Sequence, residues 1–189
     1  KARGVIFSSS AAVYGNQEGI MDENKNLAPE SPYAFQKMFG EQLGAHYANL
    51  YSLPFVALRY FNVYGKGNHE EGSYAPVTAR FLKAKREGKP LPLIGDGEQT
   101  RDFIHVEDVA RANVKAIDLL KPRSNEIINV CSGNPISIID IAKMIGGEVE
   151  HLPPRQEIKH SRGDPSKAKR LLNLIDPLSF KEELEKLIG

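Results

Sequence analysis

Residues 5–15 read VIFSSSAAVYG, and this stretch decides the fold. Its apolar half, Val5, Ile6 and Phe7, is continuous and ends abruptly in three serines. An uninterrupted apolar run of this length is typical of a strand that is buried on both faces. In parallel α/β sheets, ligands bind outside the carboxyl ends of such strands. The stretch therefore predicts a buried parallel strand whose serine-rich end faces a ligand.

The rest of the chain alternates between helix-like and strand-like segments. Ser31-Pro32 joins a capping residue to a proline at the first helical position, so a helix is expected over residues 31–50. Strands and helices that alternate at this spacing are typical of a parallel α/β sheet. Further strands are expected at residues 54–61, within 90–100, and at 101–105 and 126–130. Further helices are expected at residues 76–87, 106–120, 137–145, 165–172 and 179–188.

The composition is that of an ordinary folded domain. Hydrophobic residues make up 41% of the 189 residues and charged residues 26%, with a formal net charge of +1. This balance argues against a nucleic-acid footprint or a basic membrane patch. The single cysteine excludes an internal disulfide and is typical of a reducing compartment, so a cytoplasmic protein is expected. The apolar stretch near the N-terminus is too short to span a bilayer.

Three side chains suggest proton-transfer chemistry. Tyr33 and Lys37 lie four residues apart, so they share one face of the expected helix. A fixed positive charge favours the phenolate form of a nearby tyrosine and makes it a general base near neutral pH. Such a pair is common by chance on a surface helix and is a weak signal alone. Ser10, at the end of the expected strand, adds a hydroxyl that can share a substrate proton.

Six segments occur in a characteristic order: FSSSAAVYG, SPYAFQK, LRYFNVYG, PLPLIGDGEQTRDFIHVEDVA, INVCSG and PPRQEIKHSRGDPSKAKRLL. In this order they resemble the extended short-chain dehydrogenase/reductases, in particular the NAD-dependent nucleotide-sugar epimerases and dehydratases. The resemblance covers nearly the whole chain. It implies an α/β fold that combines the C-terminal part of a Rossmann-like parallel sheet with a small α/β substrate-binding lobe. Residues 1–65 with 101–132 would form the partial NAD-binding core, and residues 66–100 with 133–189 the nucleotide-sugar lobe.

The glycine-rich phosphate loop of that family, G-x-G-x-x-G or G-x-x-G-x-x-G, does not occur in this sequence. The resemblance implies that an upstream part would carry the first strand, this loop and the acidic residue that binds the adenosine ribose. The strand at residues 5–8 would present a sheet edge to that part. The expectation is a fragment, or a chain that needs a partner.

The residues after Ser10 separate the branches of the family. Dehydratases that this chain resembles carry an Asp-Glu pair there and decarboxylases keep a Glu, whereas this chain has Ala11 and Ala12, which cannot transfer protons. Relatives that epimerise at carbons 3 and 5 need a further acid–base pair, often with cysteine, but Cys131 lies on a different strand. The resemblance therefore implies a 4-epimerase acting on UDP-glucose/galactose or their N-acetyl forms. A 4-reductase, a heptose-type epimerase and a non-catalytic nucleotide-sugar-binding fragment stay open as alternatives.

The implied catalytic set is Ser10, Tyr33 and Lys37, with NAD as cofactor. Tyr33, as phenolate, would take the proton of the sugar 4-hydroxyl while hydride passes to NAD⁺, and Ser10 would hydrogen-bond the same oxygen. Lys37 would hold the nicotinamide ribose. The 4-keto sugar would turn over and take the hydride back on its other face, so the cofactor is not consumed. The remaining implied cofactor contacts are Ser8, Tyr60 and Phe61.

The implied substrate contacts extend beyond Ser10 and Tyr33. Asn62 would hold the diphosphate or the sugar, and Val77 would offer a backbone N–H at a helix start to a phosphate. Arg101 and Arg155 would clamp the diphosphate, because guanidinium groups match phosphate oxygens. Glu157 would accept the ribose hydroxyls. The segment that would enclose the uracil is Pro92, Leu93 and Ile94.

Other polar residues have simpler interpretations. Asp108 is expected to be a helix-start residue, His105 a core histidine, and Arg101–Asp102 would be a strand-end ion pair if it is not part of the site. The resemblance also implies a homodimer of the full-length protein, formed through the helix that starts at Ser31, and no nucleic-acid or membrane partner. No metal is expected, because the other histidines lack metal-ligand spacing: His46, His69, His151 and His160.

Overall fold

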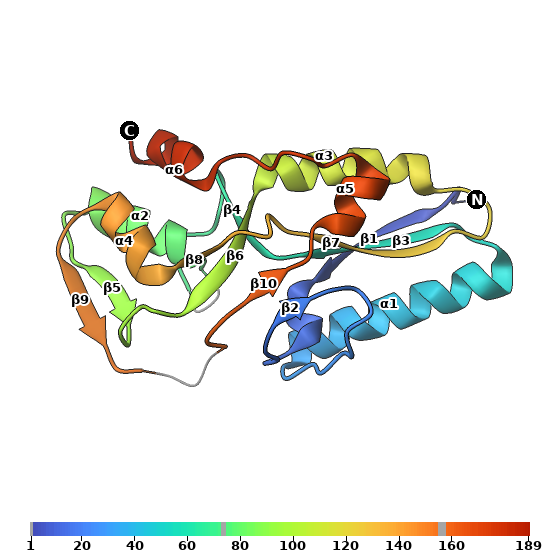
Figure 1. Ribbon diagram of the computed structural model, residues 1–189, viewed down its shortest axis with the longest axis horizontal. Coiled ribbons are helices and arrows are strands. Elements are labelled where there is room, and N and C mark those ends of the chain that lie inside the picture. Colours follow the sequence, from blue (N-terminus) through green and yellow to red (C-terminus); the bar gives the residue numbers. More distant parts are fainter. Residues whose placement is uncertain (1, 73–74, 155–157) are drawn as a thin grey trace.

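A three-stranded parallel sheet lies between the helices α1 (Pro32–Tyr51) and α3 (Val106–Ala116) in the structure, a computed structural model that describes residues 2–72, 75–154 and 158–189 (Figure 1). Its strands are β1 (Val5–Ser10), β3 (Phe55–Tyr60) and β7 (Asn125–Val130), in the order β1-β3-β7. Val5 pairs with Phe55, which in turn pairs with Asn125, so the carboxyl ends of all three strands meet at one edge. β3 is the central strand, and its first five residues are buried, as its continuous apolar pattern predicts.

Helices cover both faces of this sheet (Figure 1). One face is covered by α1 and the other by α3 and α5 (Ser166–Leu172). The core between the sheet and the helices α3 and α5 consists of aliphatic side chains. Burial of these side chains away from water holds the two helices on the sheet. Its buried members are Val56, Leu58, Ile104, Ala112, Ala116, Ile128, Val130, Ala168 and Leu172.

Local chemistry explains where α1 begins. The Ser31 hydroxyl accepts a hydrogen bond from the backbone N–H of Ala34 at 3.2 Å, and Pro32 occupies the first helical position. A capping side chain satisfies one of the helix's unpaired N–H groups, and proline has none to satisfy. The helix expected from Ser31-Pro32 is therefore confirmed, within one residue at its far end.

Two glycines bring α1 unusually close to the sheet. A Cβ atom on Gly40 would lie 2.3 Å from Cζ of Phe7, and one on Gly44 would lie 2.1 Å from Cε2 of Phe55. Neither position has room for any side chain, so the aromatic rings of β1 and β3 pack directly on the helix backbone. Glycine costs about 1 kcal/mol of helix propensity relative to alanine, and close packing offsets that cost here.

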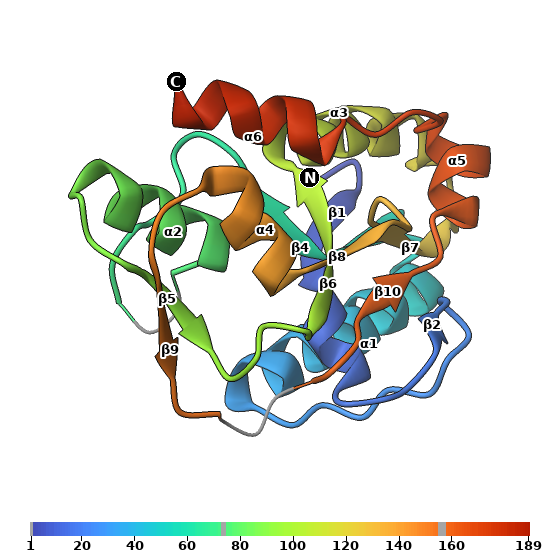
Figure 2. The same ribbon diagram turned by 60° about the vertical axis from the view of Figure 1, so that its left-hand side comes forward.

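A second group of elements surrounds its own core (Figure 2). It consists of α2 (Val77–Arg86), α4 (Ile138–Ile145), α6 (Phe180–Ile188) and the parallel strand pair β5 (Leu91–Ile94) and β9 (Val149–Leu152). Apolar residues of these elements, together with Tyr64 and Phe103, form a core separate from that of the sheet. Its largest fully buried side chains are Tyr64, Phe81, Leu91, Leu93, Ile141 and Leu184.

Short strands connect the two groups of elements. β4 (Asn62–Tyr64), β6 (Thr100–His105) and β8 (Pro135–Ser137) form a sheet in which β6 runs parallel to β4 and antiparallel to β8. β2 (Ile20–Met21) pairs with β10 (Arg162–Gly163). The sequence patterns did not predict β2, β4, β8, β9 or β10, because each is very short or polar and depends on a distant partner.

The boundaries of the other expected helices agree closely with the structure. α3 ends at Ala116 and continues as a 3-10 turn, η2 (Ile117–Leu119), so the expected helix at residues 106–120 is divided in two. Although α5 belongs to the C-terminal range assigned to the smaller lobe, it packs on β7 and α3 of the three-stranded sheet. Within the described ranges, no helix combines the length and apolar character that a membrane crossing needs.

Candidate active site

The end of β1 presents a serine hydroxyl. Ser10 has an extended backbone and caps the 3-10 helix η1 (Ala11–Tyr14), because its Oγ accepts a hydrogen bond from the N–H of Ala12 at 3.2 Å. A serine hydroxyl can accept and donate at the same time. The cap therefore fixes the Ser10 oxygen while its proton can still point toward a ligand.

The first two turns of α1 bring a phenol and an ammonium to this strand. Nζ of Lys37 donates a hydrogen bond to the backbone oxygen of Ser8 at 2.7 Å, two residues before Ser10. The same nitrogen lies 5.5 Å from the ring centre of Tyr33 and 5.4 Å from that of Phe7. Tyr33 is 49% exposed, so its phenol is accessible to a ligand. The structure thus holds Lys37 near the end of β1 and places the Tyr33 ring beside Lys37.

The other residues that the resemblance assigns to the cofactor lie around the same sheet edge. The hydroxyl of Tyr60 donates to Oδ1 of Asn113 on α3 at 3.0 Å and lies 3.2 Å from Oγ of Ser8. Phe61 is only 4% exposed and packs in a cluster with Tyr14. Ser8 and Tyr60 therefore form polar contacts on the face of the sheet that α3 covers, whereas the Phe61 ring belongs to the core.

A buried ion pair lies one helical turn after Lys37 along α1. Arg59 on β3 and Glu41 on α1 are each 2% exposed. The guanidinium binds the carboxylate in a fork, with Nε 2.9 Å from Oε1 and Nη2 2.7 Å from Oε2. Ser9 donates to the same carboxylate at 2.5 Å, and Nη1 of Arg59 donates to the Tyr14 hydroxyl at 2.9 Å. Each guanidinium nitrogen of Arg59 and each carboxylate oxygen of Glu41 thus has a hydrogen-bond partner inside the protein.

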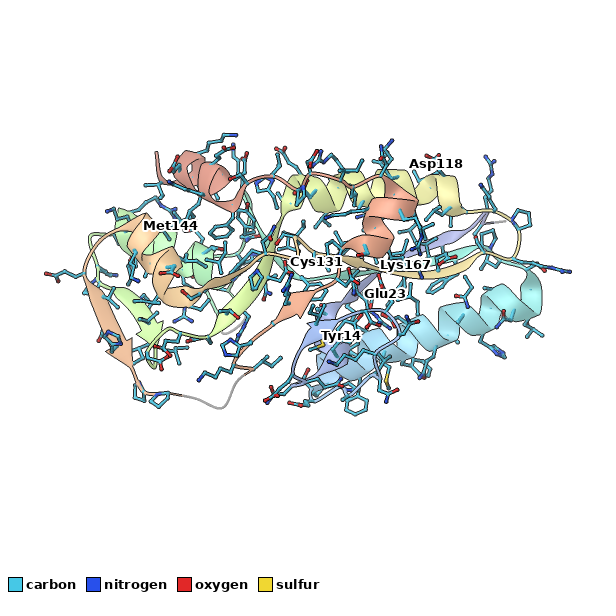
Figure 3. The ribbon with its side chains drawn as sticks, in the orientation of Figure 1. Tyr14, Glu23, Asp118, Cys131, Met144 and Lys167 are labelled. Carbon is cyan, nitrogen blue, oxygen red and sulfur yellow. The ribbon has the colours of Figure 1, made fainter. Side chains whose placement is uncertain are left out.

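The network continues from Tyr14 to β7. The Tyr14 hydroxyl donates to Oδ1 of Asn129 at 2.8 Å, and Nδ2 of Asn129 donates to the backbone oxygen of Met21 at 2.8 Å. Figure 3 shows Tyr14 and Glu23 close together near the middle of the structure, and Glu23 accepts the backbone N–H of Asn129 at 2.8 Å. Burial raises the pKa of Tyr14 to about 12, so its phenol stays protonated at neutral pH.

Sequence patterns missed this network. Arg59 lies in a segment that was interpreted only as an apolar strand, and Glu41 in one interpreted only as a helix. A charged residue inside a strand buried on both faces needs a partner, which is a signal that could have revealed the pair. The partner itself is 18 positions away in sequence.

A second buried carboxylate, Asp102 on β6, joins three segments. Its oxygens accept hydrogen bonds from the backbone N–H and the hydroxyl of Ser132 at 2.9 and 2.8 Å, and from the N–H groups of Gly133 and Gly163 at 3.0 Å each. Burial raises the pKa of the Asp102 carboxyl, and the hydrogen bonds from Gly163 and Ser132 oppose that shift. The side chain fixes the loop after β7 and strand β10 relative to β6.

The other expected substrate residues that the structure describes lie on β4, α2, β5 and β6. Nδ2 of Asn62 donates to the backbone oxygen of Asp102 at 2.8 Å, and Val77 is the first residue of α2. Nη1 of Arg101 donates to the backbone oxygen of Thr100 at 2.9 Å. Within β5, Leu93 is fully buried in the lobe core, whereas its two neighbours are partly exposed. Two expected contacts lie outside the described residues: Arg155 and Glu157.

His105 and Asp108, which the sequence did not assign to the site, are buried at the start of α3. His105 is 6% exposed and caps α3, with Nδ1 accepting the N–H of Glu107 at 3.3 Å. Asp108 lies in the first turn of α3, is 2% exposed, and accepts the backbone N–H of Leu178 at 2.9 Å together with a contact from Arg111. Both expectations, a core histidine and a helix-start aspartate, are confirmed.

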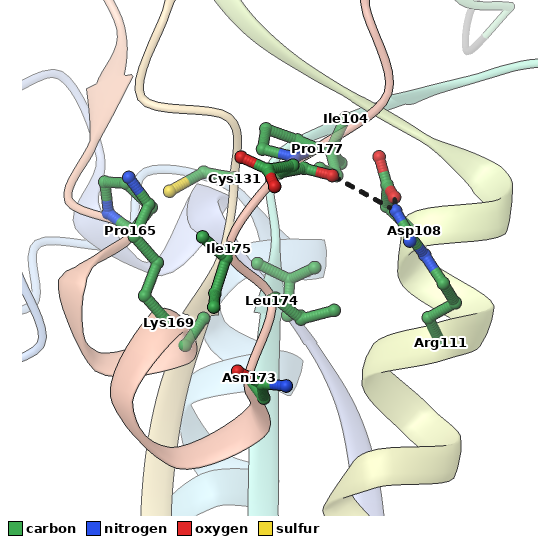
Figure 4. A pocket seen from close by; sticks show the side chains of 13 residues that line it. Ile104, Asp108, Arg111, Cys131, Pro165, Lys169, Asn173, Leu174, Ile175 and Pro177 are labelled. Carbon is green, nitrogen blue, oxygen red and sulfur yellow. Dashed lines mark hydrogen bonds and ion pairs between the residues drawn. The ribbon is translucent and has the colours of Figure 1, made fainter.

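A cavity of about 250 Å³ lies between α3 and α5, on the opposite face of the sheet from α1 (Figure 4). Its lining includes Asp108, Arg111 and Lys169, and Cys131 borders it. Burial raises the pKa of the Cys131 thiol. None of the three implied catalytic residues lines this cavity, so it is not the site that the sequence predicts.

Comparison with known proteins agrees with this geometry. The NAD dependent epimerase/dehydratase family matches residues 1–131. The chain is 34% identical over 194 residues to the UDP-glucuronate 4-epimerase of Thermodesulfobacterium geofontis, an alignment that covers 98% of this chain and 58% of that protein.

Two solved structures have the same fold. One is the UDP-N-acetylglucosamine 4-epimerase from Methanobrevibacter ruminantium in complex with UDP-N-acetylmuramic acid, with a TM-score of 0.90, 36% identity, and coverage of 98% of this chain and 62% of that one. The other is the UDP-glucuronic acid 4-epimerase from Bacillus cereus in complex with UDP-glucuronic acid and NAD, with a TM-score of 0.83, 34% identity, and coverage of 95% and 58%.

A parallel sheet with a serine at the end of one strand, and a tyrosine–lysine pair on the helix that follows, defines an α/β protein of the Rossmann-like epimerase type. The chain belongs to the NAD dependent epimerase/dehydratase family. The family resemblance and the fold class expected from the sequence are thereby confirmed. The chain spans 58% to 62% of the length of these relatives.

Proposed function

We propose that the protein containing this chain epimerises carbon 4 of a UDP-sugar by transient oxidation to the 4-keto sugar, with NAD as cofactor. The observation that carries the proposal is the contact of Lys37 with the end of β1, which brings the Tyr33 ring to the strand that ends in Ser10. The chain's similarity to proteins named UDP-sugar 4-epimerases supports the same reaction.

The described residues fit the nicotinamide-ribose end of NAD. An ammonium and a phenol at the carboxyl edge of a parallel sheet offer hydrogen-bond donors where dinucleotides bind in such folds. When bound, NAD supplies the acceptor and donor of hydride. In this proposal residues 1–65 with 101–132 contribute to its binding, and residues 66–100 with 133–189 bind the nucleotide sugar.

The side chains of this chain handle the proton and the orientation of the sugar. Tyr33 removes the proton from the 4-hydroxyl oxygen and returns it after the sugar has turned over. Ser10 donates a hydrogen bond to the same oxygen, which its capped geometry allows. Lys37, held by the Ser8 carbonyl, keeps a positive charge beside the phenol and binds the ribose. Ser8 and Tyr60 complete the cofactor side together with Phe61, which would act through its backbone because its side chain is in the core.

The nucleotide part of the substrate would bind along the lobe. The N-terminus of α2 at Val77 has no side-chain cap, so its backbone N–H groups suit a phosphate. Asn62 and Arg101 would contact the diphosphate or the sugar from the neighbouring strands β4 and β6, and the partly exposed Pro92 and Ile94 suit an aromatic base. Leu93 would act through its backbone, because its side chain is in the core. The further proposed contacts are Arg155 and Glu157.

Calorimetric titration of the 189-residue chain with UDP, and separately with NAD⁺, tests this assignment. We expect UDP to bind, and Arg101→Gln to weaken binding about tenfold because a charge-assisted contact to phosphate is lost. Arg86→Gln is the matched control, since Arg86 is exposed on α2 and pairs with Glu70. Absence of UDP binding, or equal effects of the two variants, would contradict the proposed nucleotide site.

Turnover is tested in a version of the protein extended upstream of Lys1 by its natural coding sequence. We expect interconversion of UDP-glucose and UDP-galactose, or of their N-acetyl forms, without net consumption of NAD. Net consumption of reduced cofactor would indicate a 4-reductase, and turnover only of heptose substrates a heptose-type epimerase. Binding without any turnover would indicate a nucleotide-sugar-binding protein.

The compartment is also part of the proposal. The single cysteine favours action in the reducing cytoplasm.

A homodimer of the full-length protein is part of the proposal. α1 exposes a row of large apolar side chains, which is typical of an interaction surface. Phe39 is 62% exposed, and we expect Phe39→Lys to convert a dimer to a monomer when mass is measured by light scattering on the extended protein. Ile175→Lys, at a position that is 56% exposed and lies away from α1, should leave the dimer intact. The remaining exposed members are Phe35, Leu43, Tyr47, Leu50 and Tyr51.

A further inference from the structure

Helix α1 carries the proposed base Tyr33 and its partner Lys37, yet very little apolar packing fixes this helix on the sheet. Its buried residues are Ala34, Glu41 and Ala48. Two of these are alanines, so Glu41 is the only long side chain of α1 that is buried. Most large apolar side chains of the helix face outward, and Met38 is the partly buried exception, packed beside Val13 and Tyr14.

The glycine contacts bring α1 close to the sheet but do not set its position along the strands. Gly40 lies against the ring of Phe7 and Gly44 against the ring of Phe55. A smooth backbone surface on a flat ring lacks the interlocking side chains that normally fix the rotation and the translation of a helix. Directional contacts are therefore needed to hold α1 in register: one is the hydrogen bond from Lys37 to the Ser8 carbonyl, and the others converge on Glu41.

Glu41 makes its contacts in a geometry that leaves little freedom. Both carboxylate oxygens are bound by the guanidinium fork of Arg59, and Oε1 also accepts the hydroxyl of Ser9. Ser9 immediately precedes Ser10, and Glu41 follows Lys37 by one helical turn. One buried carboxylate therefore connects the helix of the proposed base to the strand of the proposed serine.

Arg59 extends the connection to the segment that follows Ser10. Its Nη1 donates to the hydroxyl of Tyr14, the last residue of the 3-10 helix that Ser10 caps. Arg59 also pairs with Ser9 in the β1–β3 register. The strand end, the capped turn and α1 thus all meet at one guanidinium group.

Stability alone is a poor explanation for such a pair. Taking two charges out of water costs about as much as their attraction returns, and well-packed apolar residues of similar volume often replace a buried ion pair without loss of stability. A directional, bidentate contact adds geometric precision that apolar packing does not provide.

We propose that Glu41 and Arg59 are positioning residues, which set the place of Tyr33 and Lys37 relative to Ser10. The catalytic meaning of this inference rests on the proposed epimerase function. An error of about 1 Å in the placement of a reacting group can lower a rate by about 100-fold. The ion pair therefore acts on turnover, with little effect on the affinity for the nucleotide sugar.

The test uses the double variant Glu41→Leu/Arg59→Met, which removes both charges and keeps side-chain volume. In the extended protein we expect kcat to fall by about 100-fold and KM to stay within about threefold. Arg59→Lys keeps the charge without the fork, and we expect kcat about tenfold below the wild type at unchanged KM. This variant decides the question if the double variant does not fold.

Asp108→Asn is the matched control. This variant replaces another buried carboxylate, which also has an arginine partner, by an amide. Asp108 lies on α3, the helix that covers the other face of the sheet. We expect it to lower thermal stability and to leave kcat unchanged. If folded Glu41→Leu/Arg59→Met or Arg59→Lys keeps the wild-type kcat, or if Asp108→Asn lowers kcat equally, the positioning role is refuted.

Amide hydrogen exchange of the 189-residue chain separates this inference from the proposed function, because it requires no turnover. We expect the double variant to exchange about tenfold faster at residues 33–40 than the wild type, since local opening of α1 becomes easier. Asp108→Asn should not change exchange there. If the extended wild-type protein is inactive, the proposed function fails, while unchanged exchange in the double variant would overturn the positioning role itself.

Discussion

Tyr33→Phe is expected to lower kcat by about 10³-fold in the extended protein, because it removes the only proposed group that accepts the 4-hydroxyl proton. The phenylalanine ring keeps the contact with Lys37, whose Nζ lies 5.5 Å from the ring centre. Binding of the UDP-sugar should therefore change little. Steady-state rates and calorimetric binding, measured on the same preparation, separate the two effects.

Tyr47→Phe is the control for this prediction. Tyr47 lies on the same helix and is 45% exposed, and its ring packs against Tyr51 at a centre-to-centre distance of 5.3 Å. The same loss of one hydroxyl should leave kcat at the wild-type value. A Tyr33→Phe protein that retains more than a tenth of the wild-type kcat would exclude Tyr33 as the base.

Asp102→Ala is expected to lower the free energy of unfolding by about 4 kcal/mol, the largest effect on stability that we predict. The substitution leaves buried hydrogen-bond donors of Ser132, Gly133 and Gly163 without their acceptor. Each unpaired buried donor costs about 1–3 kcal/mol, although relaxation and water recover part of the sum. Chemical denaturation monitored by circular dichroism measures the loss, and Tm should fall by about 10 °C.

Asp96→Ala provides the matched comparison. Asp96 lies in an exposed turn, where its carboxylate accepts one backbone N–H, that of Glu98, at 2.9 Å. Water can replace this acceptor, so a loss below about 1 kcal/mol is expected. Equal losses for the two variants would mean that the contacts of Asp102 do not fix the loop after β7 and strand β10.

The sequence was sufficient for the elements that depend on local chemistry. The cap at Ser31 predicted the start of α1, and continuous apolar runs predicted the three strands of the central sheet. The Ser10, Tyr33 and Lys37 motif was recognised from spacing and family resemblance, and the structure brings Lys37 to the end of the strand that carries Ser10. The catalytic roles of these residues stay predictions.

The parts that the sequence did not predict depend on distant partners. β9 has the polar sequence VEHL and becomes a strand only because β5 lies beside it. The fork between Arg59 and Glu41 joins a strand to a helix, and no local pattern identifies which carboxylate an arginine will meet. Asp102 likewise binds residues about 30 and 60 positions later in the chain. Interactions of this kind are decided by the folded arrangement.

The register of the central sheet also has a consequence for how the protein acquires its structure. Val5 pairs with Phe55 and Phe55 pairs with Asn125, so neighbouring strands are separated by 50 and then 70 residues. Contacts this distant in sequence require large loops to close before any pairing energy is gained, which slows folding. During synthesis, β1 and β3 emerge long before β7, and the backbone edge of β3 that pairs with β7 stays open meanwhile. The interval before Asn125–Val130 arrives is therefore the period in which the growing chain is most prone to aggregate.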